Sequence, residues 1–162
     1  MPGGWLVTGM TAAVEGSVAW AVRYEIEVSE QWLTRSAHIA TVSGAGERSV
    51  TLTHDGSGNW LVDGLARPDL EGCLDVDLES SAMTNTFPVH RLSPRIGRRQ
   101  SAPAAYVRAH EPEVQRLEQQ YTRLDEQNHF HYEAPAFEFT AELAYDATGL
   151  IVDYPGLAQR AL

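Results

Sequence analysis

The chain has 162 residues, of which 43% are hydrophobic and 21% charged, a balance typical of a folded globular protein rather than a disordered chain. Its formal net charge of −10 would repel phosphate backbones, so nucleic acid is not an expected partner. All 12 basic residues are arginine, which excludes Schiff-base chemistry and a phosphate-loop lysine. We expect residues 1–162 to form a single domain.

No segment marks the chain for export or for a membrane. No apolar run approaches the roughly 20 residues of a spanning helix, and the first ten residues lack the basic and apolar regions of a signal peptide. We therefore predict a cytoplasmic location. The single Cys73 excludes an internal disulfide and a cysteine-rich zinc site. His129 and His131 could share a strand face, but their spacing indicates no third ligand, so we predict neither a metal nor a cofactor.

Alternating apolar and polar side chains predict β-strands through the N-terminal half. Residues 5–7 and 12–14 fit two short strands separated by a turn, and residues 18–28 fit a longer, half-buried strand. Residues 32–42 repeat the period. Arg35 there shares the parity of the apolar side chains, so it either reaches the strand end or needs a buried counter-ion.

Two further apolar runs flank the sequence DGSGN at residues 55–59, which predicts a hairpin. The segment 70–92 follows, and the rest of the prediction depends on it. In a strand over residues 73–79 (CLDVDLE), aliphatic side chains would enter a core and carboxylates would line the opposite face. The polar stretch 80–86 favours a turn, and residues 89–92 fit a returning strand.

The C-terminal half combines one candidate helix with more strands. Residues 96–103 are expected to form a loop. Apolar side chains three and four apart predict a helix over residues 114–124, although a strand through residues 117–121 also fits. The remaining strands are expected at residues 104–109, 129–132, 136–145 and 150–154. This pattern predicts a mainly β fold: an antiparallel roll or unclosed barrel with at most one or two short helices.

Seven motifs follow one another along the chain: VRYEIEV, WLTR, DGSGNW, GCLDVDL, TNTFPVHRL, QQY and DATGLIVDYPGL. In these motifs the chain resembles a bacterial family named for glycolipid binding, from about Trp20 onward. The resemblance implies a spiral β-roll, distantly similar to periplasmic carriers of lipoproteins, and the binding or carriage of a glycolipid. Members of that family usually begin with a further pair of β segments and an early tryptophan. We do not find this pair, and its loss would expose a sheet edge to a second subunit.

Charged and aromatic side chains near the segment 70–92 form the candidate ligand site. Carboxylates and amides can bond sugar hydroxyls, arginines can grip an anionic group, and indole rings can stack on a sugar or line an acyl groove. The predicted ligand-binding residues are Arg35, Asp75, Asp77, Asn85, Arg91, Trp32 and Trp60.

The same charged residues allow a purely structural interpretation. Asp75 with Arg35, and Asp77 with Arg91, would then be ion pairs between strands, and Asn85 would bond the backbone of its own turn.

We expect non-catalytic binding of a glycolipid or another amphipathic ligand. One alternative is a small hydrolase or isomerase that acts on a sugar-like compound through Asp75 and Asp77, whose Cα atoms would lie about 6 to 7 Å apart on one strand face. Another is a structural assembly module, in which an exposed edge would support a homo-oligomer. A deep apolar cavity would favour the carrier, and a narrow polar cleft with a carboxylate of raised pKa would favour the enzyme.

Overall fold

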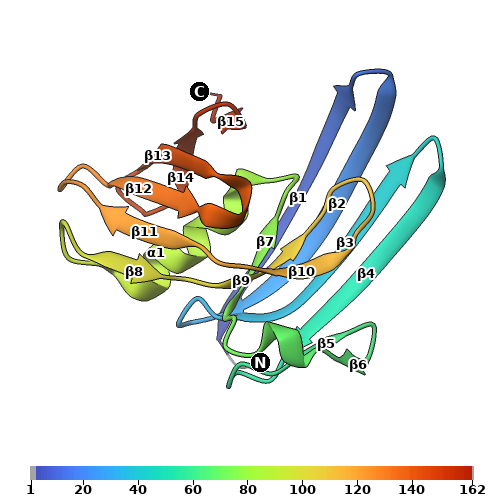
Figure 1. Cartoon of the computed structure of the whole chain (residues 1–162), viewed down its shortest axis with the longest axis horizontal. Helices are drawn as coiled ribbons and strands as arrows, with labels where there is room; N and C mark the ends of the chain where they lie inside the picture. The colour runs from blue at the N-terminus through green and yellow to red at the C-terminus, as the bar shows by residue number, and fades with distance from the viewer. Residues whose placement is uncertain (1–2, 162) are drawn as a thin grey trace.

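The computed structural model describes residues 3–161, which form three β-sheets (Figure 1). In spatial order, the first sheet contains β1 (Gly4–Glu15), β2 (Val18–Ser29), β3 (Thr34–Ser43), β4 (Gly46–His54), β5 (Trp60–Val62) and β6 (Leu65–Ala66). The second contains β10 (Val114–Leu117), β9 (Ala104–Val107) and β7 (Asp75–Leu78). The third contains β15 (Ala158–Gln159), β14 (Ile151–Tyr154), β13 (Phe139–Tyr145), β12 (His129–Ala134), β11 (Gln120–Arg123) and β8 (Arg99–Ser101).

Helical structure is confined to short segments that follow or precede strands. Within residues 3–161 the α-helix is α1 (Thr86–Leu92), and the 3-10 turns are η1 (Pro68–Leu70), η2 (Ala82–Asn85) and η3 (Pro135–Phe137). Neither large sheet closes into a barrel, because each ends in strands that pair on one side only. The predicted mainly β, unclosed architecture is therefore confirmed.

The first sheet is an antiparallel meander whose register follows the alternation of its side chains. In β2 the apolar side chains from Trp20 to Val28 are buried at every second position, and the charged ones between them face solvent. Gly9 in β1 lies opposite Tyr24, and a Cβ atom there would come 2.3 Å from the Tyr24 hydroxyl oxygen. Glycine thus leaves room for the Tyr24 ring, whose hydroxyl lies 3.0 Å from Ser81 Oγ.

The second sheet joins the other two. Figure 1 shows β7 and β9 between the long N-terminal strands and the C-terminal sheet, and these two strands pair in parallel. Thr34 at the start of β3 fastens this sheet to the first: its Oγ1 accepts a hydrogen bond of 3.0 Å from Val76 N, and its own N donates to Leu74 O. One hydrophobic core lies between the first sheet and β7, and a second lies inside the C-terminal sheet.

The N-terminal residues differ from the prediction of two short strands. A single strand, β1, runs through the Gly-Met-Thr segment and pairs with β2 in continuous register from Gly4 to Glu15. Apolar residues occupy both faces of β1, including exposed positions such as Met10 and Val14. The sequence therefore shows no alternation of apolar and polar side chains along this strand. β1 carries Trp5 and pairs with β2, so the chain begins with a pair of β segments and an early tryptophan, contrary to the prediction that such a pair is absent.

Residues 89–92 are helical rather than a returning strand. They form the end of α1, which follows directly on η2 and buries Phe87 and Val89. Pro88 lies in the first turn of this helix. Backbone N–H groups in the first turn have no intrahelical acceptor, so the lack of an N–H in proline costs no helical hydrogen bond. Proline therefore fits the start of a helix here and does not mark an interrupted ladder.

The predicted helix over residues 114–124 is wrong, and the strand alternative is nearer the structure. β10 pairs with β9, whereas β11 pairs with β12 and β8 in another sheet. The buried side chains of Val114, Leu117 and Tyr121 lie three and four apart because the chain changes sheets between two four-residue strands. Residues 96–103, expected as a loop, include the short strand β8.

Candidate functional site

β7 is buried on both faces, and its two aspartates lie on the face away from the first core. Asp75 is 1% exposed and receives a hydrogen bond from Arg91 Nη1 of α1. Burial raises the pKa of Asp75 to about 6, although the guanidinium of Arg91 acts in the opposite direction. This contact is an ion pair between a strand and a helix, and it corrects the predicted pairing of Asp75 with Arg35.

Asp77 has a different environment two residues later. It is 7% exposed and accepts hydrogen bonds from neutral groups: Thr84 Oγ1 donates to Oδ1 over 2.7 Å, and Gln119 Nε2 donates to Oδ2. Burial raises the pKa of this carboxyl, and the two donors lower it in part. The predicted Asp77–Arg91 pair is therefore wrong, because Arg91 bonds Asp75 instead.

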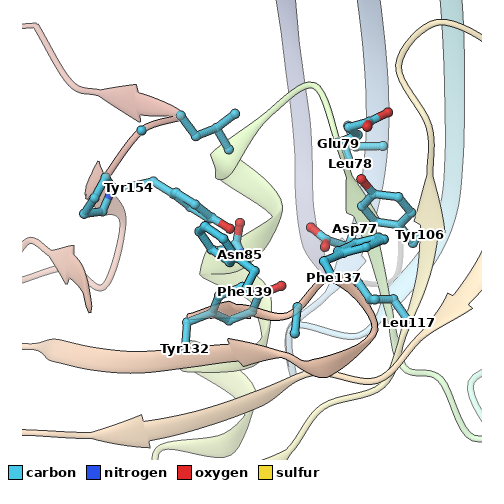
Figure 2. A pocket seen from close by; sticks show the side chains of 14 residues that line it. Asp77, Leu78, Glu79, Asn85, Tyr106, Leu117, Tyr132, Phe137, Phe139 and Tyr154 are labelled. Atoms are coloured by element: carbon cyan, nitrogen blue, oxygen red, sulfur yellow. The ribbon is translucent and has the colours of Figure 1, made fainter. Parts of the chain in front are cut away.

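Asp77 lies at one side of a cavity of about 330 Å³ between the second and third sheets (Figure 2). Its lining comes from β7, β9, β10, β12, β13, β14 and the turns η2 and η3. The side chains shown in Figure 2 include Asp77, Glu79, Asn85, Leu117 and five aromatic residues, Tyr106, Tyr132, Phe137, Phe139 and Tyr154. The cavity is thus largely aromatic, with two carboxylates, Asp77 and Glu79, in its lining.

The aromatic rings form two groups. Tyr132, Phe139 and Tyr154 contact one another, with ring centroids 5.9 to 6.2 Å apart. Tyr106 and Phe137 form a second pair with centroids 5.3 Å apart, and Figure 2 shows Asp77 beside this pair. All four distances are within the range of favourable aromatic contacts. The rings therefore pack against one another and can contact an apolar or planar ligand in the cavity.

The charged side chains that line the cavity are acidic. Asp77 and Glu79 line it, and its lining, as the structure describes it, contains no arginine or histidine. Burial raises the pKa of Tyr106, Tyr132 and Tyr154, and the Asp77 charge acts in the same direction on all three. The phenols therefore stay neutral at physiological pH and can serve as hydrogen-bond donors.

The structure brings only some of the predicted site residues to this cavity. Asn85 lines it together with Asp77; its Nδ2 donates to the Tyr121 hydroxyl over 2.9 Å, and its backbone oxygen accepts from the Tyr145 hydroxyl. Arg35 instead lines a separate pocket of about 320 Å³ beside β1 and β2, on the first sheet. Asp75 and Arg91 bond each other outside the cavity.

The two predicted tryptophans are also elsewhere. Trp60 is 2% exposed, belongs to the first core and donates from Nε1 to the Cys73 oxygen over 2.9 Å. The Trp32 ring stacks on Trp5 and on His90, with centroids 4.5 and 3.9 Å away. Both indoles are thus engaged in contacts within the protein.

Sequence reasoning missed the aromatic walls as a site. Alternation places Phe137 and Phe139 on one face of the predicted strand 136–145, whereas the tyrosines come from β9, β12 and β14, which belong to two sheets and do not pair with one another. The single useful signal was the aromatic alternation at residues 137 and 139, which a core strand would show equally well.

Other reactive groups do not form a site. Cys73 is fully buried, and burial raises the pKa of its thiol to about 11, so it stays protonated. Within residues 3–161 no group of three or more His, Cys, Asp or Glu side chains is arranged to hold a metal ion. Across the same residues, no helix has both the length and the apolar character needed to cross a bilayer.

Comparison with known proteins agrees with the fold. A family model described as Putative glycolipid-binding matches residues 1–160, so the match includes the β1–β2 pair. The chain is also similar to the crystal structure of a DUF1089 family protein from Pseudomonas aeruginosa: the TM-score is 0.86 and the identity 34%, over 98% of this chain and 92% of that one. No protein of curated function matches. Because the family model covers nearly all its residues, the chain belongs to the Putative glycolipid-binding family.

Proposed function

We propose that this protein binds an amphipathic ligand, such as a glycolipid, in the cavity between the second and third sheets, without catalysis. The observation that carries this proposal is the cavity itself: five aromatic side chains surround a few polar groups, Asp77, Glu79 and Asn85. Ligand sites in proteins combine apolar walls with a small number of placed polar groups in this way.

The size of the cavity indicates which part of such a ligand it would hold. Its volume of about 330 Å³ is at the lower end of the range for small-molecule sites. This space suits a head group or the first part of a chain rather than a whole lipid. Phe137 and Leu157 line the cavity and are 47% and 49% exposed, so a chain that leaves the cavity would pass over them.

The geometry does not support the enzymatic alternative that uses two carboxylates. Of the two predicted aspartates, Asp77 lines the cavity, while Asp75 is held by Arg91 outside it. A pair of carboxylates that shares the work of glycoside hydrolysis must flank one bond. These two do not face a common space, so the raised pKa of Asp77 is an effect of burial that a binding site explains equally well.

Assembly and location remain predictions. β1 forms the edge of the first sheet and leaves Leu6, Met10 and Val14 exposed. Such an edge favours a homo-oligomer in which β1 contacts a second subunit. Native mass spectrometry gives the subunit number. Cell fractionation tests the predicted cytoplasmic location.

Binding is tested with octyl β-D-glucoside, a neutral amphiphile below its micelle concentration, by titration calorimetry. We expect saturable binding to the wild type and at least tenfold weaker binding to Phe137→Ser, because this change removes one exposed wall of the cavity. Ile96→Ser is the matched control, since Ile96 is similarly exposed but lies outside the cavity lining. Native mass spectrometry of the purified protein would also detect any lipid that it retains.

The proposal fails if the wild type binds no amphiphile and retains no lipid. It also fails if Phe137→Ser and Ile96→Ser weaken binding equally, because the cavity would then have no part in it.

A further inference from the structure

The two buried aspartates of β7 differ in how their charge is compensated. Asp75 has the guanidinium of Arg91 as a partner. Asp77 has two neutral donors, Thr84 and Gln119, and no cation of the described chain bonds it. A buried carboxylate without a cation is costly, because neutral hydrogen bonds replace only part of its hydration. The fold thus neutralises one aspartate and leaves the other facing a cavity.

The rest of the cavity adds no positive charge. Glu79 is the other charged side chain in its lining, and it is also acidic. The protein as a whole carries a formal net charge of −10, which raises the local concentration of cations around it. An anionic head group would therefore meet repulsion here, whereas a cationic group would be attracted.

Aromatic rings supply the second feature that cations recognise. The negative faces of aromatic rings attract ammonium groups within about 6 Å of the ring centroid. Tyr106 and Phe137 lie beside Asp77, and Tyr132, Phe139 and Tyr154 form another wall of the same cavity (Figure 2). A cavity that combines aromatic walls with acidic side chains suits an organic ammonium group better than a neutral sugar.

We propose that the cavity binds a ligand that carries an ammonium group, with Asp77 as the counter-ion and the surrounding tyrosine and phenylalanine rings as its cage. This inference rests on the proposed function and deepens it by assigning a positive charge to the part of the amphiphile that enters the cavity. The ammonium group would neutralise the charge of Asp77, as Arg91 neutralises that of Asp75.

The experiment compares two probes of the same shape that differ in one charge. Octanoylcholine carries a quaternary ammonium group, and 3,3-dimethylbutyl octanoate is its neutral carbon isostere. Octyl β-D-glucoside is the third probe and reports on neutral amphiphiles in general. Octanoylcholine and octyl β-D-glucoside are titrated below their micelle concentrations, and the neutral isostere below its solubility limit. All titrations are at pH 8, which favours the ionised form of Asp77, since burial raises the pKa of this carboxyl.

The wild type is expected to bind octanoylcholine at least tenfold more tightly than the isostere. Asp77→Asn is expected to reduce this preference to less than threefold by removing the counter-ion. Glu126→Gln is the matched control, because it removes the same charge from an exposed position outside the cavity and should keep the full preference. If Asp77→Asn does not fold, the comparison of the two probes on the wild type still decides.

The results separate the two proposals. Equal affinities for the cation and its isostere would overturn the ammonium assignment and leave amphiphile binding intact. A preference retained in Asp77→Asn would also overturn it, because the charge would then act elsewhere. If none of the three probes binds, both the ammonium assignment and the proposed function are lost.

Discussion

Arg91, in the last turn of α1, donates to the carboxylate of Asp75 in β7 and so neutralises the more deeply buried of the two aspartates in that strand. This contact ties the helix to the central sheet. It also has a direct consequence for stability, because neither partner can be removed without leaving the other poorly compensated.

The first prediction concerns this pair. Arg91→Met should lower the free energy of unfolding by about 3 to 5 kcal/mol, since it leaves a buried carboxylate without its cation. The double variant Asp75→Asn/Arg91→Met should recover part of the loss. Urea denaturation at pH 7 measures both, with Arg98→Met as a control at an exposed arginine. A loss below about 1 kcal/mol for Arg91→Met, the usual value for a surface pair, would show that the contact does not stabilise the fold.

The second prediction is that the contribution of Asp75 to stability falls with rising pH. The pKa of Asp75 is raised to about 6 in the native protein, so the native state binds more protons than the unfolded state between about pH 4 and pH 6. The contribution of this group to the free energy of unfolding therefore falls through that window and is constant above it. In urea unfolding from pH 4 to pH 8, the free energy of unfolding of the wild type should decrease relative to that of Asp75→Asn as the pH rises. Identical pH profiles would contradict the assignment.

The third prediction has the opposite sign and concerns the turn before β14. Asp146 accepts hydrogen bonds from Thr148 Oγ1 at 2.6 Å, from Arg160 at 2.6 Å and from Leu150 N at 3.0 Å. These donors, Thr148 first, lower the pKa of Asp146, so its stabilising contribution is present above about pH 4 and is lost as the pH falls through the lowered native pKa.

Asp146→Asn should therefore lower the thermal midpoint at pH 7, and the difference from the wild type should shrink toward pH 2. Glu142→Gln in the adjacent strand β13 is exposed and serves as the control. A difference in midpoint that does not change with pH would mean that the Asp146 charge has no role in the turn.

The fourth prediction concerns the hydrogen bond that joins the first and second sheets. Thr34→Val keeps the side-chain shape but leaves Val76 N without its acceptor in a fully buried position. We expect a loss of about 1 to 3 kcal/mol in the free energy of unfolding. Thr53→Val is the control, because Thr53 is exposed in the neighbouring strand β4. Equal effects of the two changes would exclude a special role for Thr34.

The sequence predicts strands well where one face is buried and the other solvated. β2 and β12 alternate cleanly, and their bounds follow the expected segments closely. The failures have a common physical cause: α1, β10 and β11 are too short to show a period of their own. In β10 and β11 the buried face changes with the sheet, which imitates helical spacing.

The candidate site was predictable only in part. The alternation in DVDL places both aspartates on one face of β7, and the position of Asn85 after the strand follows from the same local pattern. The ion-pair partners and the aromatic walls depend on how β7, β9, β12 and β14 meet in space. That arrangement is set by pairing between distant segments, which local alternation does not report.

The parallel pairing of β7 with β9 has a consequence for the order in which the chain folds. Strands β1 to β4 pair only with sequence neighbours, whereas β7 must wait for β9 before its ladder can form. Pulse-labelled hydrogen exchange should therefore show protected amides in β2 and β3 before those of β7. The cavity would be the last feature to mature, and a newly made chain would be unable to hold its ligand until that late step is complete.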